Sequence, residues 1–78
     1  MKHFSITIRS FSEVQEFVAL AMVQPFEVLV GNENQRINGK SFMGMFSLDF
    51  RCPVQVHVNC DEVAFARFRK EAARFMIA

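Results

Sequence analysis

The side chains best suited to chemistry in this sequence are two histidines and two cysteines, His3, His57, Cys52 and Cys60. An imidazole can bind zinc or relay a proton, and a thiolate can attack a substrate, but each needs further ligands or an orienting partner. Both histidines fall at outward positions of predicted strands, where the other outward residues carry only hydroxyl or amide groups. If these strands are neighbours, the two imidazoles can approach each other on the open sheet face. We expect ordinary surface histidines, with no catalytic residue, metal or cofactor.

The two cysteines flank one predicted strand and are expected to be free thiols. Extended residues rise ~3.3 Å each, so the intervening strand holds the Cα atoms of Cys52 and Cys60 far beyond the ~7 Å limit for a disulfide. No histidine stands at a spacing that would activate either thiol. Free thiols are typical of reducing compartments. The apolar and polar residues near the amino terminus alternate, unlike those of a signal peptide, and the longest apolar run, residues 17–23, is far short of the ~20 residues that span a bilayer. We expect a cytoplasmic protein that does not bind membranes.

The composition indicates one folded domain over residues 1–78. Half of the chain is hydrophobic (51%), with 10 Phe, and the net charge is +1. This is too apolar for a disordered chain, and no global charge attracts it to nucleic acid. The basic residues near the carboxyl end are interspersed with acidic ones, namely Arg67, Arg69, Lys70 and Arg74 among Asp61, Glu62 and Glu71. We interpret them as a solvated helix face and expect no nucleic-acid partner.

The spacing of apolar residues predicts seven elements in the order strand, helix, strand, strand, short helix, strand, helix. They cover about residues 4–8, 11–23, 26–30, 35–38, 42–48, 54–58 and 62–76. One stripe of the last helix carries Phe65, Phe68, Ala72, Phe75 and Met76. Each strand has one apolar face and each long helix one apolar stripe. This pattern favours an α+β open-faced sandwich, in which a four-stranded antiparallel sheet has three helices on one face.

Polar residues at the predicted boundaries suggest how the helices and the hairpin are stabilised. Ser10 and Glu13 fit a capping box at the start of the first helix. Ser41 is the expected N-cap of the short helix, and Asp61 that of the last helix. Asn34 is expected to adopt the left-handed backbone that a tight hairpin turn usually requires.

The short helix carries more large apolar side chains than one helix face can bury. If Met45 and Leu48 face the core, then Phe42, Met43 and Phe46 face outward as a patch at positions i, i+1 and i+4. Methionine and phenylalanine together form an adaptable surface for docking a partner. The alternative is that some of these side chains complete the core of a very small domain.

The segment Lys40-Ser41-Phe42-Met43-Gly44-Met45-Phe46-Ser47-Leu48 resembles a Lys-Ser-Ile-Met-Gly-Val-Met-Ser-Leu segment of the histidine-containing phosphocarrier (HPr) family of bacterial sugar transport. The two align without a gap and are identical at six positions. The element order also resembles that of HPr, βαββαβα, so the resemblance covers essentially the whole chain. It implies that Ser41 corresponds to the serine phosphorylated by HPr kinase in Gram-positive bacteria. It also implies that Phe42, Met43 and Phe46 correspond to the apolar surface that members present to protein partners.

The sequence departs from the family where the phosphorylated histidine of HPr stands. The family's Gly-Leu-His-Ala-Arg-Pro loop is replaced by residues 9–16, which contain no histidine, and an ungapped count places Ser10 at the histidine position. A serine hydroxyl is a weak nucleophile and cannot form the phosphoramidate. Glu13 and Glu16 are expected to repel an incoming phosphoryl group. Phosphate transfer from phosphoenolpyruvate is therefore not expected.

Three hypotheses follow from these observations. The first is an HPr-like regulatory protein that lacks phosphohistidine transfer and is phosphorylated on Ser41, with HPr kinase or a regulator as its protein partner. The second is a phosphocarrier that uses a different residue, such as His3, which lies at the strand end opposite the helix start. The third is a structural interaction module without phosphorylation, in which Ser41 only caps its helix. The identity of the partner and the oligomeric state are left open by the sequence.

Overall fold

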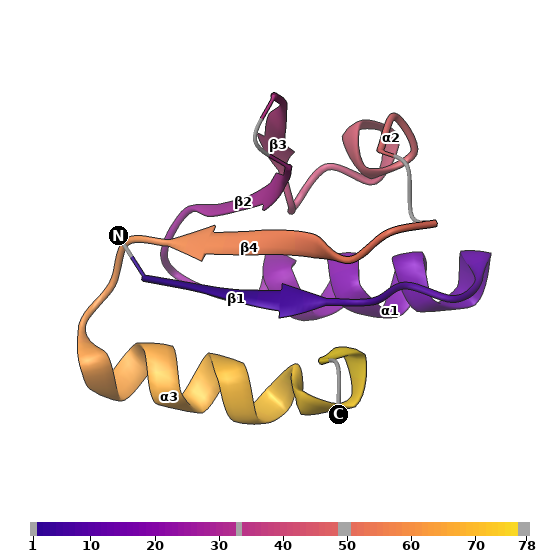
Figure 1. The fold of residues 1–78 in the computed structure, drawn as a ribbon. Helices are drawn as coiled ribbons and strands as arrows, with labels where there is room; N and C mark the ends of the chain where they lie inside the picture. The colour runs from indigo at the N-terminus through magenta and orange to yellow at the C-terminus, as the bar shows by residue number, and fades with distance from the viewer. Residues whose placement is uncertain (1, 33, 49–50, 77–78) are drawn as a thin grey trace.

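The computed structural model describes residues 2–32, 34–48 and 51–76. Its elements follow the predicted order (Figure 1): β1 (Lys2–Ile6), α1 (Phe11–Met22), β2 (Val28–Gly31), β3 (Arg36–Asn38), α2 (Phe42–Met45), β4 (Val54–Val58), α3 (Glu62–Glu71) and the 3-10 turn η1 (Ala73–Phe75). Most predicted boundaries agree to within two residues. The exceptions are α2 and α3, which are shorter than the sequence pattern predicts.

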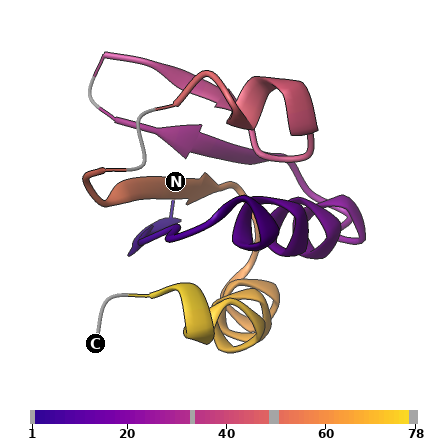
Figure 2. The same cartoon turned by 90° about the vertical axis from the view of Figure 1, so that its right-hand side faces the viewer.

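The four strands form one antiparallel sheet in the order β1-β4-β2-β3. Figure 2 shows the sheet on one side and α1, α2 and α3 together on the other. The predicted α+β open-faced sandwich is therefore confirmed. The register places His3 opposite His57 and Ser5 opposite Gln55. Directly paired residues share a face, so these four side chains lie on the face that the helices leave open.

Phenylalanine rings fill the core between the sheet and the two long helices. Phe17, Phe68 and Phe75 are almost fully buried. The Phe68 ring lies 5.7 Å from Phe4, 5.6 Å from Phe26 and 6.4 Å from Phe17, measured between centroids. These spacings are typical of tilted and edge-to-face aromatic pairs. Phe68 therefore joins the sheet to both long helices.

The carboxyl-terminal segment turns toward β1 instead of continuing as helix. The α-helix ends at Glu71, and Ala72 and Phe75 remain buried as the predicted stripe requires. The amide of Thr7 donates a hydrogen bond of 2.7 Å to the Phe75 carbonyl, and Met76 forms a bridge with Ile6. Pairing with a strand edge requires extended backbone, which explains why the helix is shorter than its apolar pattern. The basic residues Arg67, Arg69, Lys70 and Arg74 are exposed, as expected.

The hairpin between β2 and β3 is held by the side chain of Asn32. No described residue has a positive φ, so the left-handed backbone expected for Asn34 is not found. Instead, the Asn32 side-chain oxygen accepts hydrogen bonds from the amides of Asn34 (2.9 Å) and Gln35 (3.0 Å). The Asn32 amide in turn donates to the Gln35 carbonyl. A side chain that bonds the backbone ahead of it stabilises a turn without a left-handed residue.

Candidate functional site

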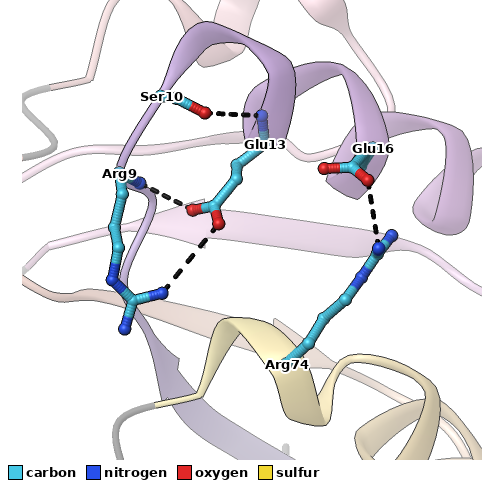
Figure 3. Close-up of polar contacts among 5 residues, drawn as sticks. All are labelled: Arg9, Ser10, Glu13, Glu16 and Arg74. Carbon is cyan, nitrogen blue, oxygen red and sulfur yellow. Dashed lines mark hydrogen bonds and ion pairs between the residues drawn. The ribbon is translucent and has the colours of Figure 1, made fainter.

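The start of α1 is closed by side chains that bond its free amide groups (Figure 3). Ser10 is the N-cap, and its Oγ accepts a hydrogen bond from the Glu13 amide at 3.3 Å. The Glu13 carboxylate accepts from the Arg9 amide at 2.7 Å, one residue earlier than a capping box places it. The predicted cap residues are therefore confirmed, but the return bond goes to Arg9. Ser10 Oγ is engaged in the cap, and no imidazole lines its surroundings in the described part of the chain.

The two acidic residues near Ser10 are both paired with arginines (Figure 3). Glu13 lies 3.9 Å from the Arg9 guanidinium, and Glu16 lies 3.0 Å from that of Arg74. Exposed pairs of this kind contribute ~1 kcal/mol or less to stability. Because each carboxylate has a cation beside it, the repulsion expected from Glu13 and Glu16 is largely neutralised. The absence of a nitrogen nucleophile at position 10 remains the main obstacle to phosphate relay.

Ser41 caps α2 in the predicted way. Its Oγ accepts a hydrogen bond of 3.1 Å from the Gly44 amide, and its backbone is extended. The helix has only the four residues Phe42–Met45, followed by a turn to Ser47. Gly44 leaves the space beside Ser41 open, since a Cβ there would lie 3.3 Å from Ser41 Oγ. Ser41 itself is half-buried. Its hydroxyl therefore makes one hydrogen bond among the described residues, to the Gly44 backbone.

Three phenylalanine rings from α1 and α2 form a cluster next to Ser41. Phe46 stacks on Phe11 at 5.1 Å and contacts Phe42 edge-on at 4.8 Å, while Phe11 lies 5.8 Å from Phe42. Met43 beside them is 79% exposed. We call Phe11, Phe42, Met43 and Phe46 the aromatic patch. Met45 and Leu48 are buried as predicted.

The exposure of the patch differs from the sequence expectation in two residues. Phe42 was expected to face outward but is half-buried and packs against the core. Phe11 is 58% exposed, although sequence analysis assigned it no role. Phe11 lies three residues before the buried Val14, so helical spacing alone places it on the core stripe. At this first position of α1 the neighbour of the ring is α2 and not the core, so the ring stays exposed. The only sequence feature that indicated the exposure of Phe11 was its place as a large ring directly after the N-cap.

An open pocket of about 420 Å³ lies between the start of α1 and the aromatic patch. Its lining residues are Ile8, Arg9, Ser10, Phe11, Val14, Phe46 and Arg51. The lining is mainly apolar, with arginines as its charged residues. Among the described residues that line it, none is a carboxylate or a thiol, and this mainly apolar lining is typical of a binding site.

The remaining candidate residues lie elsewhere. The His3 and His57 rings face each other at 5.5 Å on the open sheet face, as the strand register requires. Both cysteines are free, and burial, followed by the Asp61 carboxylate, raises the pKa of Cys60. A protonated thiol is a poor nucleophile. In the described residues, no three His, Cys, Asp or Glu side chains group as a metal site. None of the described helices combines the length and the apolar character that a membrane span needs.

A scan of the sequence against protein-family models gave no match, and a search of curated proteins gave none. Among solved structures, the chain is similar to the crystal structure of HPr-C-His from Thermoanaerobacter tengcongensis. The TM-score is 0.73, with 25% sequence identity over 92% of this chain and 93% of that chain. The similarity extends over nearly the whole of both chains, and it agrees with the element order and sheet topology found above. The chain therefore has an HPr-like fold.

Proposed function

We propose that this chain is an HPr-like regulatory protein that acts by binding protein partners and not by catalysis. The aromatic patch is the docking surface, and phosphorylation of Ser41 by an HPr kinase changes which partner docks. The proposal includes no phosphohistidine transfer. The observation that carries it is the position of Ser41 next to exposed rings, with Phe42 as the following residue and Phe46 stacked on Phe11.

The exposure of the patch supports docking. Met43 and Phe11 are mostly exposed, and Phe46 is 42% exposed. Exposed aromatic and methionine side chains in one cluster are typical of protein–protein contacts. The adjoining pocket extends this apolar surface toward Arg9. A partner with an apolar anchor and an acidic rim would match this combination.

The environment of Ser41 supports a switch. A phosphoryl group adds a charge of about −1.5 to −2 at neutral pH. The nearest described cation along the chain, Lys40, extends its ammonium to the Gln24 carbonyl at 2.8 Å. The new charge would therefore lie beside apolar rings, with the ammonium of Lys40 already engaged elsewhere. A partner that buries the rings would then have to desolvate the phosphate, which disfavours its docking.

Incubation with a purified HPr kinase and ATP is expected to add one phosphate to this chain. The chain with Ser41→Ala is expected to gain none, because Ser41 is the residue that the resemblance aligns with the serine phosphorylated by HPr kinase. Intact-mass spectrometry checks the number of phosphates. Ser47→Ala is the matched control, since Ser47 belongs to the same segment and its hydroxyl donates to the Gly44 carbonyl.

A chain that stays unmodified while an authentic HPr is phosphorylated in the same tube would contradict the switch and leave Ser41 as a helix cap. Equal loss of phosphate in Ser47→Ala would show that the segment, and not the Ser41 hydroxyl, decides the result. An unmodified chain would still leave docking at the patch to be tested separately.

Met43→Glu and Phe46→Glu are each expected to weaken binding of a purified partner, with HPr kinase as the probe, by tenfold or more. The reason is that a carboxylate would be desolvated at the centre of an apolar contact. Titration calorimetry measures the dissociation constant. Met43→Glu should leave Tm nearly unchanged, since Met43 is 79% exposed. Phe46→Glu should cost about 1–2 kcal/mol, because it removes two ring contacts.

Val63→Glu is the control for these two variants. Val63 is 71% exposed on α3 and undergoes the same change in charge and apolar area. Unchanged binding by Met43→Glu, or equal weakening by Val63→Glu, would refute docking at the aromatic patch.

A further inference from the structure

The open face of the sheet contains a hollow between β1, β4 and the β2–β3 hairpin. The register aligns Gln55, Gly31 and Arg36 in one row across three strands, with His57 one pleat away from Gln55 on the same face. Gly31 has no side chain, and the Gln35 backbone fills the place where its Cβ would stand. This hollow has a volume of about 280 Å³ and is lined by His3, Asn32, Arg36, Gln55 and His57.

The groups around the hollow are mainly hydrogen-bond donors. The Asn32 side-chain oxygen already accepts two backbone hydrogen bonds, which leaves its NH2 group to donate outward. Arg36 makes no ion pair within the described part of the chain and is exposed. Both imidazoles can donate when protonated. Among the described residues, no carboxylate lines this hollow. It therefore combines cationic and neutral donors from different strands.

The electrostatics of His57 agree with an unbalanced positive cluster. Its pKa is lowered by burial and then by the positive charges of Arg36, His3 and the amino terminus. The residues paired with His57 are the imidazole His3 on β1 and the apolar Leu29 on β2, and Arg36 lies one strand further on. A bound anion would offset these charges and favour the protonated imidazole.

We propose that this hollow binds a phosphate group. Its volume lies below the range usual for drug-sized ligands, which favours a small ion or the end of a larger ligand. Donors that converge from several strands suit a tetrahedral anion, and an arginine fork suits its oxygens. The Gln55 oxygen Oε1 is buried without a hydrogen-bond partner among the described residues. Rotation of the Gln55 amide toward the hollow would let this oxygen accept the O–H of hydrogen phosphate, a donor that sulfate lacks.

Titration with inorganic phosphate at constant ionic strength tests the proposal, with the two histidine Cε1–H resonances observed by NMR. The chain contains two histidines, His3 and His57, so one His57→Gln variant assigns both signals. Saturable shifts of both signals are expected, and phosphate should raise the pKa of His57, which burial and the nearby positive charges lower. Sulfate should bind more weakly. Methyl phosphate is the second probe. If it binds more tightly than inorganic phosphate, the natural ligand is a phosphate ester. If it binds more weakly, the natural ligand is the free phosphate ion.

Arg36→Gln is expected to weaken phosphate binding by about tenfold, which is the usual effect of losing one charge-assisted hydrogen bond. Arg67→Gln is the matched control, because it removes the same charge from an exposed position on α3. Equal weakening in the two variants, shifts that never saturate, or sulfate binding as tight as phosphate would each overturn the proposal. Thermal unfolding of both variants without ligand verifies that they are folded.

Discussion

Replacing Phe68 with alanine is expected to cost about 3–5 kcal/mol, the range for deleting a buried aromatic ring. Phe68 is fully buried, and its ring contacts Phe4, Phe17 and Phe26. No other described ring joins the sheet, α1 and α3 in this way. A domain of this size has a total stability of roughly 5–10 kcal/mol. The substitution should therefore remove about half of it or leave the chain largely unfolded.

Urea or thermal unfolding, followed by circular dichroism, measures this loss. A decrease in Tm of about 15 °C or more is expected, since 1 kcal/mol corresponds to ~4–8 °C in so small a domain. Val63→Ala on the same helix is the control, because Val63 is exposed and its removal should change stability by ~0.5 kcal/mol or less. A cost for Phe68→Ala below about 1 kcal/mol would contradict the packing described above.

The fold was predictable because one chemical pattern repeats along each element. Val54, Val56 and Val58 are all buried and alternate with Gln55 and His57, as a strand with one covered face requires. The proximity of the two histidines followed from the same alternation once β1 and β4 were paired. Local patterns of this kind depend on nearest neighbours in the chain, so they can be read without the tertiary structure.

The end of the last helix was less predictable because a tertiary contact decided it. The apolar stripe continues through Phe75 and Met76, but β1 offers unpaired backbone at Ile6 and Thr7. Pairing there satisfies backbone groups that a longer helix would leave at the sheet edge. Sequence spacing does not reveal which strand edge lies next to a helix end.

The aromatic patch was predicted in part for a related reason. Spacing within α2 correctly separated the buried Met45 from the exposed Met43. It could not reveal that Phe11, distant in the chain, would stack on Phe46 and leave Phe42 half-buried. The patch arises where the ends of α1 and α2 meet, so it depends on how two elements pack. The hollow on the open face has the same origin, because its lining comes from three strands and a turn.

Gly31→Ala is expected to destabilise the chain by at least about 2 kcal/mol, through overpacking against backbone. A Cβ at position 31 would overlap the Gln35 carbonyl oxygen and lie 2.8 Å from the Gln35 carbonyl carbon and 2.9 Å from the Arg36 Cα. Backbone atoms cannot rotate away as a side chain can, so the hairpin would have to open. Opening it would also move Arg36 and Asn32, which line the hollow.

Thermal unfolding should therefore show a decrease in Tm of about 10 °C or more for Gly31→Ala. Phosphate should no longer shift the histidine resonances, even at temperatures where the variant is folded. Gly44→Ala is the comparison, since its Cβ would meet side chains and no backbone, Ser41 Oγ at 3.3 Å and Ile37 Cδ1 at 3.6 Å, and alanine favours a helix. Gly44→Ala should keep the response to phosphate and lose little stability. If Gly31→Ala has the same Tm as the unsubstituted chain, the hairpin can accept a Cβ. The close approach of Gln35 then does not explain why glycine stands at position 31.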